Sequence, residues 1–139
     1  MFTHILVPTD FTEKSLKAMN VAVKMALSEE CKLTLLHVIE TIENAEYEEF
    51  EGFYDKLKNR AEERMDETAD RYGREKLPIH TEIILGNRAR EIIGFAQEHD
   101  IDLIVLSSHK IAADRPGEGW GTISYKVAIL SHCPVLMIK

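Results

Sequence analysis

One segment of the sequence combines the residue types that bind phosphate. It runs from residue 107 to residue 122 and reads SSHKIAADRPGEGWGT, directly before a predicted helix. Its glycines would let backbone N–H groups approach an anion closely, and a helix N-terminus adds about half a positive charge. The Thr122 hydroxyl and the cations Lys110 and Arg115 could add contacts. A flexible surface loop has a similar composition, so both interpretations stay open.

A second candidate is Asp10, which follows the first apolar segment, Ile5 to Val7, and the pair Pro8-Thr9. A carboxylate at the end of a buried strand can accept hydrogen bonds from ribose hydroxyls or help to hold a metal bound to phosphates. The same side chain could equally well cap the turn or helix that follows.

The other titratable residues favour structural roles. His37 lies within an apolar run, which favours a packed, hydrogen-bonded imidazole over a catalytic one. The histidines and cysteines lack metal-site spacing, and no nucleophile motif occurs, so we expect neither a metal site nor catalytic residues. An enzyme interpretation extends at most to slow ATP hydrolysis, with Asp10 and His109 as its only candidates. An acidic stretch is predicted to form a solvated loop and helix start; it comprises Glu40, Glu43, Glu46, Glu48, Glu49 and Glu51.

Length and charge exclude several classes of protein. The chain has 139 residues, which predicts one domain spanning residues 1–139. Its net charge of −7 disfavours a nucleic-acid-coating role, because neutralising phosphates needs a basic face. No apolar run approaches the roughly 20 residues that span a bilayer, and no secretory signal is evident. Two cysteines without a CxxC motif favour a reducing cytoplasm.

Apolar runs and helical periodicities alternate along the whole chain. Five short runs without polar alternation predict strands buried on both faces. Four intervening segments have apolar residues at helical spacing, with Thr12 or Ser15 capping the first and Asn87 the third. Strict alternation predicts an α/β fold with a parallel sheet and helices on both faces. The predicted strands are Ile5 to Val7, Lys32 to Ile39, Ile79 to Leu85, Asp102 to Leu106 and Val135 to Ile138.

Both candidate segments follow strands that should lie near the point where the strand order reverses. In an open parallel sheet, ligands bind beyond the carboxyl ends of the strands at that point. The first and fourth strands are the candidates to flank it. We therefore expect the loop around Asp10 and the segment from Ser107 to Thr122 to face each other.

Several motifs, taken in order, resemble the universal stress protein family. They are ILVPTDFTEKSLKAM, LLHVIE, LGNRAREII, IDLIVLSSH and the closing HCPVLMIK. The resemblance covers essentially the whole chain and implies a single-domain, Rossmann-like open sheet of five parallel strands in the order 3-2-1-4-5. It also implies a homodimer in which the last strands, Val135 to Ile138, pair antiparallel. An apolar edge strand of this kind is a liability unless it is covered or paired.

The resemblance bears on nucleotide binding as well. Family members that bind ATP carry Gly-x-x-Gly, nine residues and then Gly-Ser/Thr after the fourth strand. Here Ser107 and Lys110 occupy the two glycine positions, ten residues separate Lys110 from Gly121, and Gly121-Thr122 is retained. The two side chains add bulk where a backbone normally approaches phosphates. A serine hydroxyl and a lysine ammonium are nevertheless donors to phosphate oxygens.

The resemblance implies a nucleotide site assembled from three parts of the chain. Pro8, Thr9 and Asp10 would line the adenine–ribose side, and the backbone of Val38 would contact adenine. The ribose–phosphate side would be lined by Ser107, His109, Lys110, Gly121 and Thr122.

Two hypotheses follow for the function. The first is a regulatory stress-response module that binds ATP, ADP or AMP, alone or with Mg²⁺. The alternative is a nucleotide-independent dimeric stress or scaffold protein of the same family.

Overall fold

Helices and strands alternate along the chain in a computed structural model, which describes residues 1–73, 77–108 and 122–139. Each of the five strands and four helices expected from the sequence is present, and a short 3-10 helix, η1, precedes the second helix. The strands are β1 (His4–Pro8), β2 (Lys32–Glu40), β3 (Ile79–Gly86), β4 (Leu103–Ser107) and β5 (Val135–Ile138). The helices are α1 (Glu13–Glu29), η1 (Tyr47–Phe50), α2 (Glu51–Arg71), α3 (Arg88–Glu98) and α4 (Ile123–Leu130).

The strands form one parallel sheet in the order β3-β2-β1-β4-β5. This order confirms the predicted α/β fold and its 3-2-1-4-5 arrangement. Strand β1 lies at the centre, with Val7 opposite Leu35 of β2 and Leu6 opposite Ile104 of β4. The strand order therefore reverses between β1 and β4.

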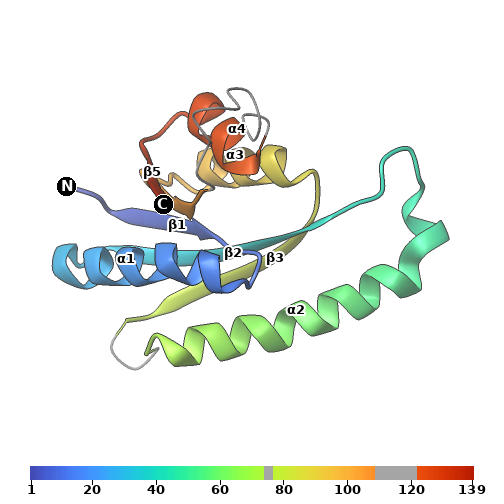
Figure 1. Ribbon diagram of the computed structural model, residues 1–139, viewed down its shortest axis with the longest axis horizontal. Coiled ribbons are helices and arrows are strands. Elements are labelled where there is room, and N and C mark those ends of the chain that lie inside the picture. Colours follow the sequence, from blue (N-terminus) through green and yellow to red (C-terminus); the bar gives the residue numbers. More distant parts are fainter. Residues whose placement is uncertain (74–76, 109–121) are drawn as a thin grey trace, which may run out of the picture.

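The helices form a layer on each face of the sheet (Figure 1). Helices α1 and α2 cover one face, and α3 and α4 cover the other. Successive side chains of a strand point to opposite faces, so Val7 packs in the core beneath α1 while Leu6 packs beneath α3 and α4. Burying one such aliphatic side chain stabilises the fold by about 1.5–3 kcal/mol.

Local sequence signals set where the helices begin. The Thr12 side chain caps α1 by accepting a hydrogen bond from the Ser15 N–H, and Asn87 caps α3 by accepting one from the Arg90 N–H. Both residues were predicted as caps. The acidic stretch from residue 40 to residue 51 is exposed at all six glutamates, which confirms that it is solvated.

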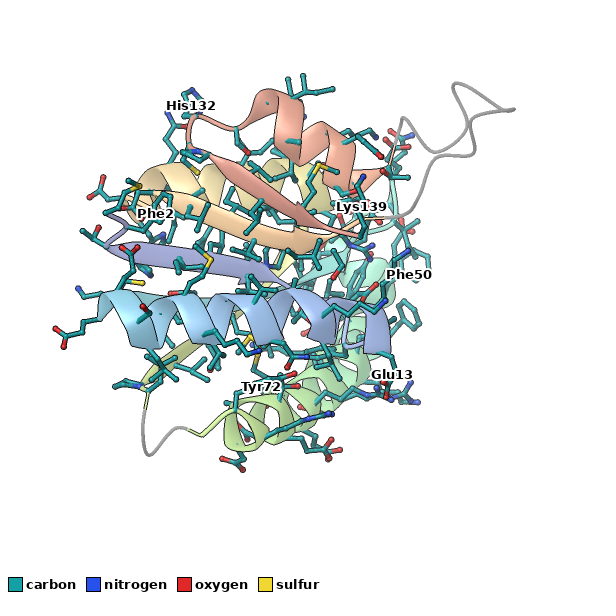
Figure 2. All side chains as sticks on the ribbon, turned by 60° about the vertical axis from the view of Figure 1, so that its left-hand side comes forward. Phe2, Glu13, Phe50, Tyr72, His132 and Lys139 are labelled. Atoms are coloured by element: carbon teal, nitrogen blue, oxygen red, sulfur yellow. The ribbon has the colours of Figure 1, made fainter. Side chains whose placement is uncertain are left out.

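Asp102 ties β1 and β4 together at their amino ends. Its carboxylate accepts hydrogen bonds from the N–H and hydroxyl of Thr3, both at 2.8 Å, and from the N–H of His4 at 3.0 Å. This end of the molecule, which carries Phe2 and His132, lies opposite the end that carries Glu13, Phe50 and Lys139 (Figure 2). The carboxyl ends of β1 and β5 therefore share the end opposite Asp102.

No helix in the described ranges is long and apolar enough to cross a membrane. Both cysteines, Cys31 and Cys133, are free thiols, and burial raises the pKa of each.

Candidate functional site

A cavity of about 500 Å³ opens at the carboxyl ends of β1, β2 and β4. It lies where the strand order reverses, as the sequence predicted. We call it the crevice cavity. Among the described residues it is lined by Pro8, Thr9, Asp10, Thr12, Lys14, Ser15, Leu36, Val38, Arg88, Ile92, Leu106, Ser107, Thr122, Ile123 and Ser124.

Six of the predicted site residues line this one cavity: Pro8, Thr9, Asp10, Val38, Ser107 and Thr122. They come from β1 and the loop after it, from β2, from the end of β4 and from the cap of α4. The structure thus brings together segments more than a hundred residues apart in the sequence. The other three predicted residues, His109, Lys110 and Gly121, lie outside the described residues.

The turn after β1 is fixed by Thr9. Its N–H donates to the Leu36 carbonyl at 2.9 Å, which continues the pairing of β1 with β2 past the end of the strand. Its buried hydroxyl accepts a hydrogen bond from the Phe11 N–H at 3.0 Å and lies 3.0 Å from the Ser15 hydroxyl. These bonds hold Phe11 in the left-handed region, with a φ of 65°, which a non-glycine residue rarely adopts.

Asp10 has the turn-forming role that the sequence left open, and it also lines the cavity. Its Oδ1 atom accepts hydrogen bonds from the Thr12 N–H at 3.0 Å and from the Thr12 hydroxyl at 2.6 Å. Burial acts to raise the pKa of Asp10, but these hydrogen bonds, with one from Ser15, hold it below its ordinary value. The cavity therefore contains a carboxylate that stays ionised at neutral pH.

Ser107 connects the two sides of the crevice. Its hydroxyl donates to the Lys14 carbonyl at 2.5 Å and so links the end of β4 to the first turn of α1. This hydroxyl hydrogen is therefore directed at the protein backbone rather than at a phosphate. The serine at the family's first glycine position has a structural role here.

The N-terminus of α4 lines the side of the cavity opposite the loop after β1. Thr122 occupies the cap position, but its side chain makes no capping hydrogen bond and its hydroxyl lies 3.2 Å from that of Ser124. The first backbone N–H groups of a helix have no partner within the helix. In α4 the Thr122 side chain leaves them uncapped, and they lie beside the cavity.

Two cations in the cavity wall, Lys14 and Arg88, were not identified from the sequence. Each lies in the first turn of a helix that follows a strand, next to the predicted caps Thr12 and Asn87. Their position in the sequence could have identified them as site residues, because the first turn of a helix that follows a strand lies at the carboxyl edge of the sheet. Arg88 also lies near Glu40, with 4.0 Å between Nη2 and Oε2.

His37 is packed and hydrogen-bonded, as predicted. Its Nδ1–H donates to the Thr9 carbonyl at 2.8 Å, and its ring lies 4.5 Å from the ring of Phe11. Burial lowers the pKa of His37, so the imidazole is neutral at pH 7 and supports the turn before Asp10. Within the described ranges, no three His, Cys, Asp or Glu residues are grouped so that they could hold a metal ion.

Comparison with known proteins assigns the family. Residues 1–139 match the model of the universal stress protein family. The chain belongs to the universal stress protein family. Universal stress protein YxiE of Bacillus subtilis is 28% identical to it over 150 residues, covering 100% of both chains. The solved structure of universal stress protein UspA from Lactobacillus plantarum has a TM-score of 0.81 and 25% identity, covering 99% of this chain and 98% of that one.

Two other universal stress protein structures share the fold and hold adenine nucleotides. One is a complex with cAMP, at a TM-score of 0.77 and 22% identity, covering 99% of this chain and 97% of that one. The other, from Archaeoglobus fulgidus, is a complex with dAMP, at a TM-score of 0.73 and 15% identity, covering 100% of this chain and 98% of that one. At these identities the likeness to this chain is one of fold alone.

The hydrogen bonds at Asp10 generate a first prediction. The substitution Thr12→Val removes one of the bonds that hold the pKa of Asp10 down, so this pKa should rise toward its ordinary value. Carboxyl ¹³C NMR across a pH titration measures the change. The same variant loses the cap of α1 and about 1 kcal/mol of unfolding free energy.

Thr41→Val is the matched control, because Thr41 is exposed and does not line the cavity. It should leave the Asp10 titration unchanged. An Asp10 pKa that is the same in Thr12→Val and in the unmodified protein would contradict this account of the turn.

Proposed function

We propose that this universal stress protein is a regulatory module that binds an adenine nucleotide in the crevice cavity. One observation carries the proposal: an apolar wall, an ionised carboxylate and an uncapped helix N-terminus meet around a single cavity at the reversal of strand order. Its volume of about 500 Å³ falls in the range of small-molecule sites.

Each part of a nucleotide has a complementary part of the cavity. Val38 and Leu106 form an apolar floor, and the partly exposed side chains of Pro8 and Ile123 add the apolar surface that a purine base needs. Asp10 can accept hydrogen bonds from ribose hydroxyls, as carboxylates do in other parallel-sheet nucleotide sites. The first turn of α4, with Thr122, can hold the phosphate through backbone N–H groups and the helix dipole.

The family members in complex with cAMP and dAMP support a monophosphate as ligand. Both are adenine nucleotides with one phosphate. In this chain Ser107 and Lys110 stand where ATP-binding members have glycines, and the Ser107 hydroxyl already donates to Lys14. We therefore infer a preference for AMP over ADP and ATP. Asp10 is the carboxylate that would assist a Mg²⁺ ion carried by a longer phosphate chain.

Binding rather than turnover would be the regulatory event. A ligand in the crevice would contact β1, β2, β4 and the start of α4 at once. At one hundred times its dissociation constant it would stabilise the folded chain by about 2.7 kcal/mol. We propose that residues 1–139 act as one domain in the cytoplasm, with hydrolysis at most slow.

The nucleotide proposal is tested by the ligand that the purified protein carries. Mass spectrometry of small molecules released on denaturation should detect an adenine nucleotide. Isothermal titration with AMP, ADP and ATP, with and without Mg²⁺, should show the highest affinity for AMP. Asp10→Asn should weaken AMP binding about tenfold, because it removes a charged acceptor worth about 1.5 kcal/mol.

Asp100→Asn is the matched control, since Asp100 is an exposed aspartate that does not line the crevice cavity. It should bind AMP with unchanged affinity. Protein that releases no nucleotide and gives no heat with any of the three ligands would favour the alternative, a nucleotide-independent scaffold.

We also propose that two copies of the chain pair through β5. This strand forms one edge of the sheet, and β4 is its partner among the described strands. The carbonyls of Pro134 and Ile138 point toward β4. The N–H and C=O groups of the alternate residues, Val135 and Met137, therefore point away from the sheet.

The edge at β5 also exposes apolar side chains. Leu136 is 38% exposed, and Ile129 and Leu130 on the adjacent α4 are 76% and 59% exposed. An antiparallel β5–β5 pair would supply hydrogen-bond partners for the backbone groups of this edge strand and cover the apolar surface.

Light scattering at micromolar concentration tests the pairing and should give twice the 15.9 kDa of one chain. Leu136→Lys should shift the protein to the mass of one chain, because it places two like charges close together across the pair. Leu27→Lys, at an exposed leucine of α1, should remain a dimer. A monomeric unmodified protein at this concentration would contradict the proposal.

A further inference from the structure

A second cavity, of about 360 Å³, lies between α2 and the carboxyl end of β2. We call it the α2 cavity. Helix α2 runs along one face of the sheet, next to β2 and β3 (Figure 1). Its side chains therefore reach the carboxyl end of β2. In the described part of the chain the cavity is lined by Asp10, Phe11, His37, Val38, Ile39, Glu40, Leu57, Arg60, Ala61, Arg64 and Arg88.

The α2 cavity concentrates positive charge in an acidic protein. The chain has seven arginines and a net charge of −7, and three of those arginines line this cavity. Arg60 and Arg64 lie four residues apart, one turn along α2. Like charges at this spacing destabilise a helix unless something neutralises them. No described residue accepts a hydrogen bond or forms an ion pair with either guanidinium.

The two carboxylates in the cavity wall contact residues other than Arg60 and Arg64. Glu40 lies 4.0 Å from Arg88. Asp10 accepts two hydrogen bonds from Thr12. His37 is neutral, since burial lowers its pKa. The guanidinium groups of Arg60 and Arg64 therefore remain available for an anion that enters from outside, and arginine binds phosphate in a bidentate geometry.

The α2 cavity adjoins the crevice cavity. Asp10, Val38 and Arg88 line both. If the base packed on Val38 and the phosphate reached α4, the ribose would lie beside Asp10 and Arg88, between the two cavities. A second anionic group on that ribose would point out of the crevice cavity and into the α2 cavity.

We propose that the ligand is an adenosine nucleotide with a second phosphate on its ribose, and that Arg60, Arg64 and Arg88 bind this phosphate. The proposal rests on the proposed function, because it assumes that the first phosphate and the base occupy the crevice cavity. It assigns the α2 cavity a role in choosing among adenine nucleotides.

Isothermal titration with three ligands tests the assignment: AMP, adenosine 3′,5′-bisphosphate and adenosine 2′,5′-bisphosphate. One of the bisphosphates should bind at least about tenfold more tightly than AMP, with a gain that shrinks at high salt because Arg60 and Arg64 are exposed. In the double variant Arg60→Gln/Arg64→Gln this gain should fall to within about twofold, while AMP affinity stays unchanged. Glutamine preserves helix propensity and removes the charge.

Lys56→Gln/Lys58→Gln is the matched control, because it removes the same charge from the same helix outside the cavity. It should retain the tenfold preference. If AMP binds but neither bisphosphate binds more tightly, or if the preference survives in the arginine variant, the α2 cavity assignment is wrong and the nucleotide proposal stands. If the lysine variant loses the preference equally, general charge explains it and the assignment is also wrong. If none of the three ligands binds, both proposals fail.

Discussion

The reversal of strand order between the parallel strands β1 and β4 is the constraint on which the site depends. After β1 the chain crosses to the face covered by α1, and after β4 it crosses to the face covered by α4. Two adjacent strands whose connections leave in opposite directions necessarily leave a gap at their carboxyl ends. The hydrogen bond from the Ser107 hydroxyl to the Lys14 carbonyl joins the end of β4 to the first turn of α1 beside this gap. Further polar groups of the crevice cavity come from the loop after β1 and the start of α4, on the two sides of the gap.

The sequence predicted the fold because its signals are local and periodic. Unbroken apolar runs such as Ile5 to Val7 can be buried only in a sheet covered on both faces, and the structure buries all three residues completely. Thr12 and Asn87 were recognisable as caps because a capping side chain acts on an N–H three residues ahead. Asp10 and Thr122 could be named from the residues because they lie at a strand end and at a helix start, whereas the role of Val38 came from the resemblance to the family.

Contacts between distant segments could not be read from the sequence. The periodicity of α2 predicts that Ala61 and Met65 are buried, but not that Arg60 and Arg64 lie across a cavity from Arg88. That arrangement depends on the packing of α2 against β2 and β3. The partner of the Ser107 hydroxyl could not be predicted either, because a serine at a glycine position can contact a phosphate or the protein backbone. Only the neighbouring first turn of α1 selects between them.

The central claim is that an adenine nucleotide occupies the crevice at the strand reversal. A crystal structure of the protein grown with AMP tests it most directly. The account predicts electron density for the base against Val38, for the ribose within hydrogen-bonding distance of Asp10, and for the phosphate at the first turn of α4. Well-ordered crystals with an empty crevice at saturating AMP, or with AMP bound only elsewhere on the protein, would contradict it.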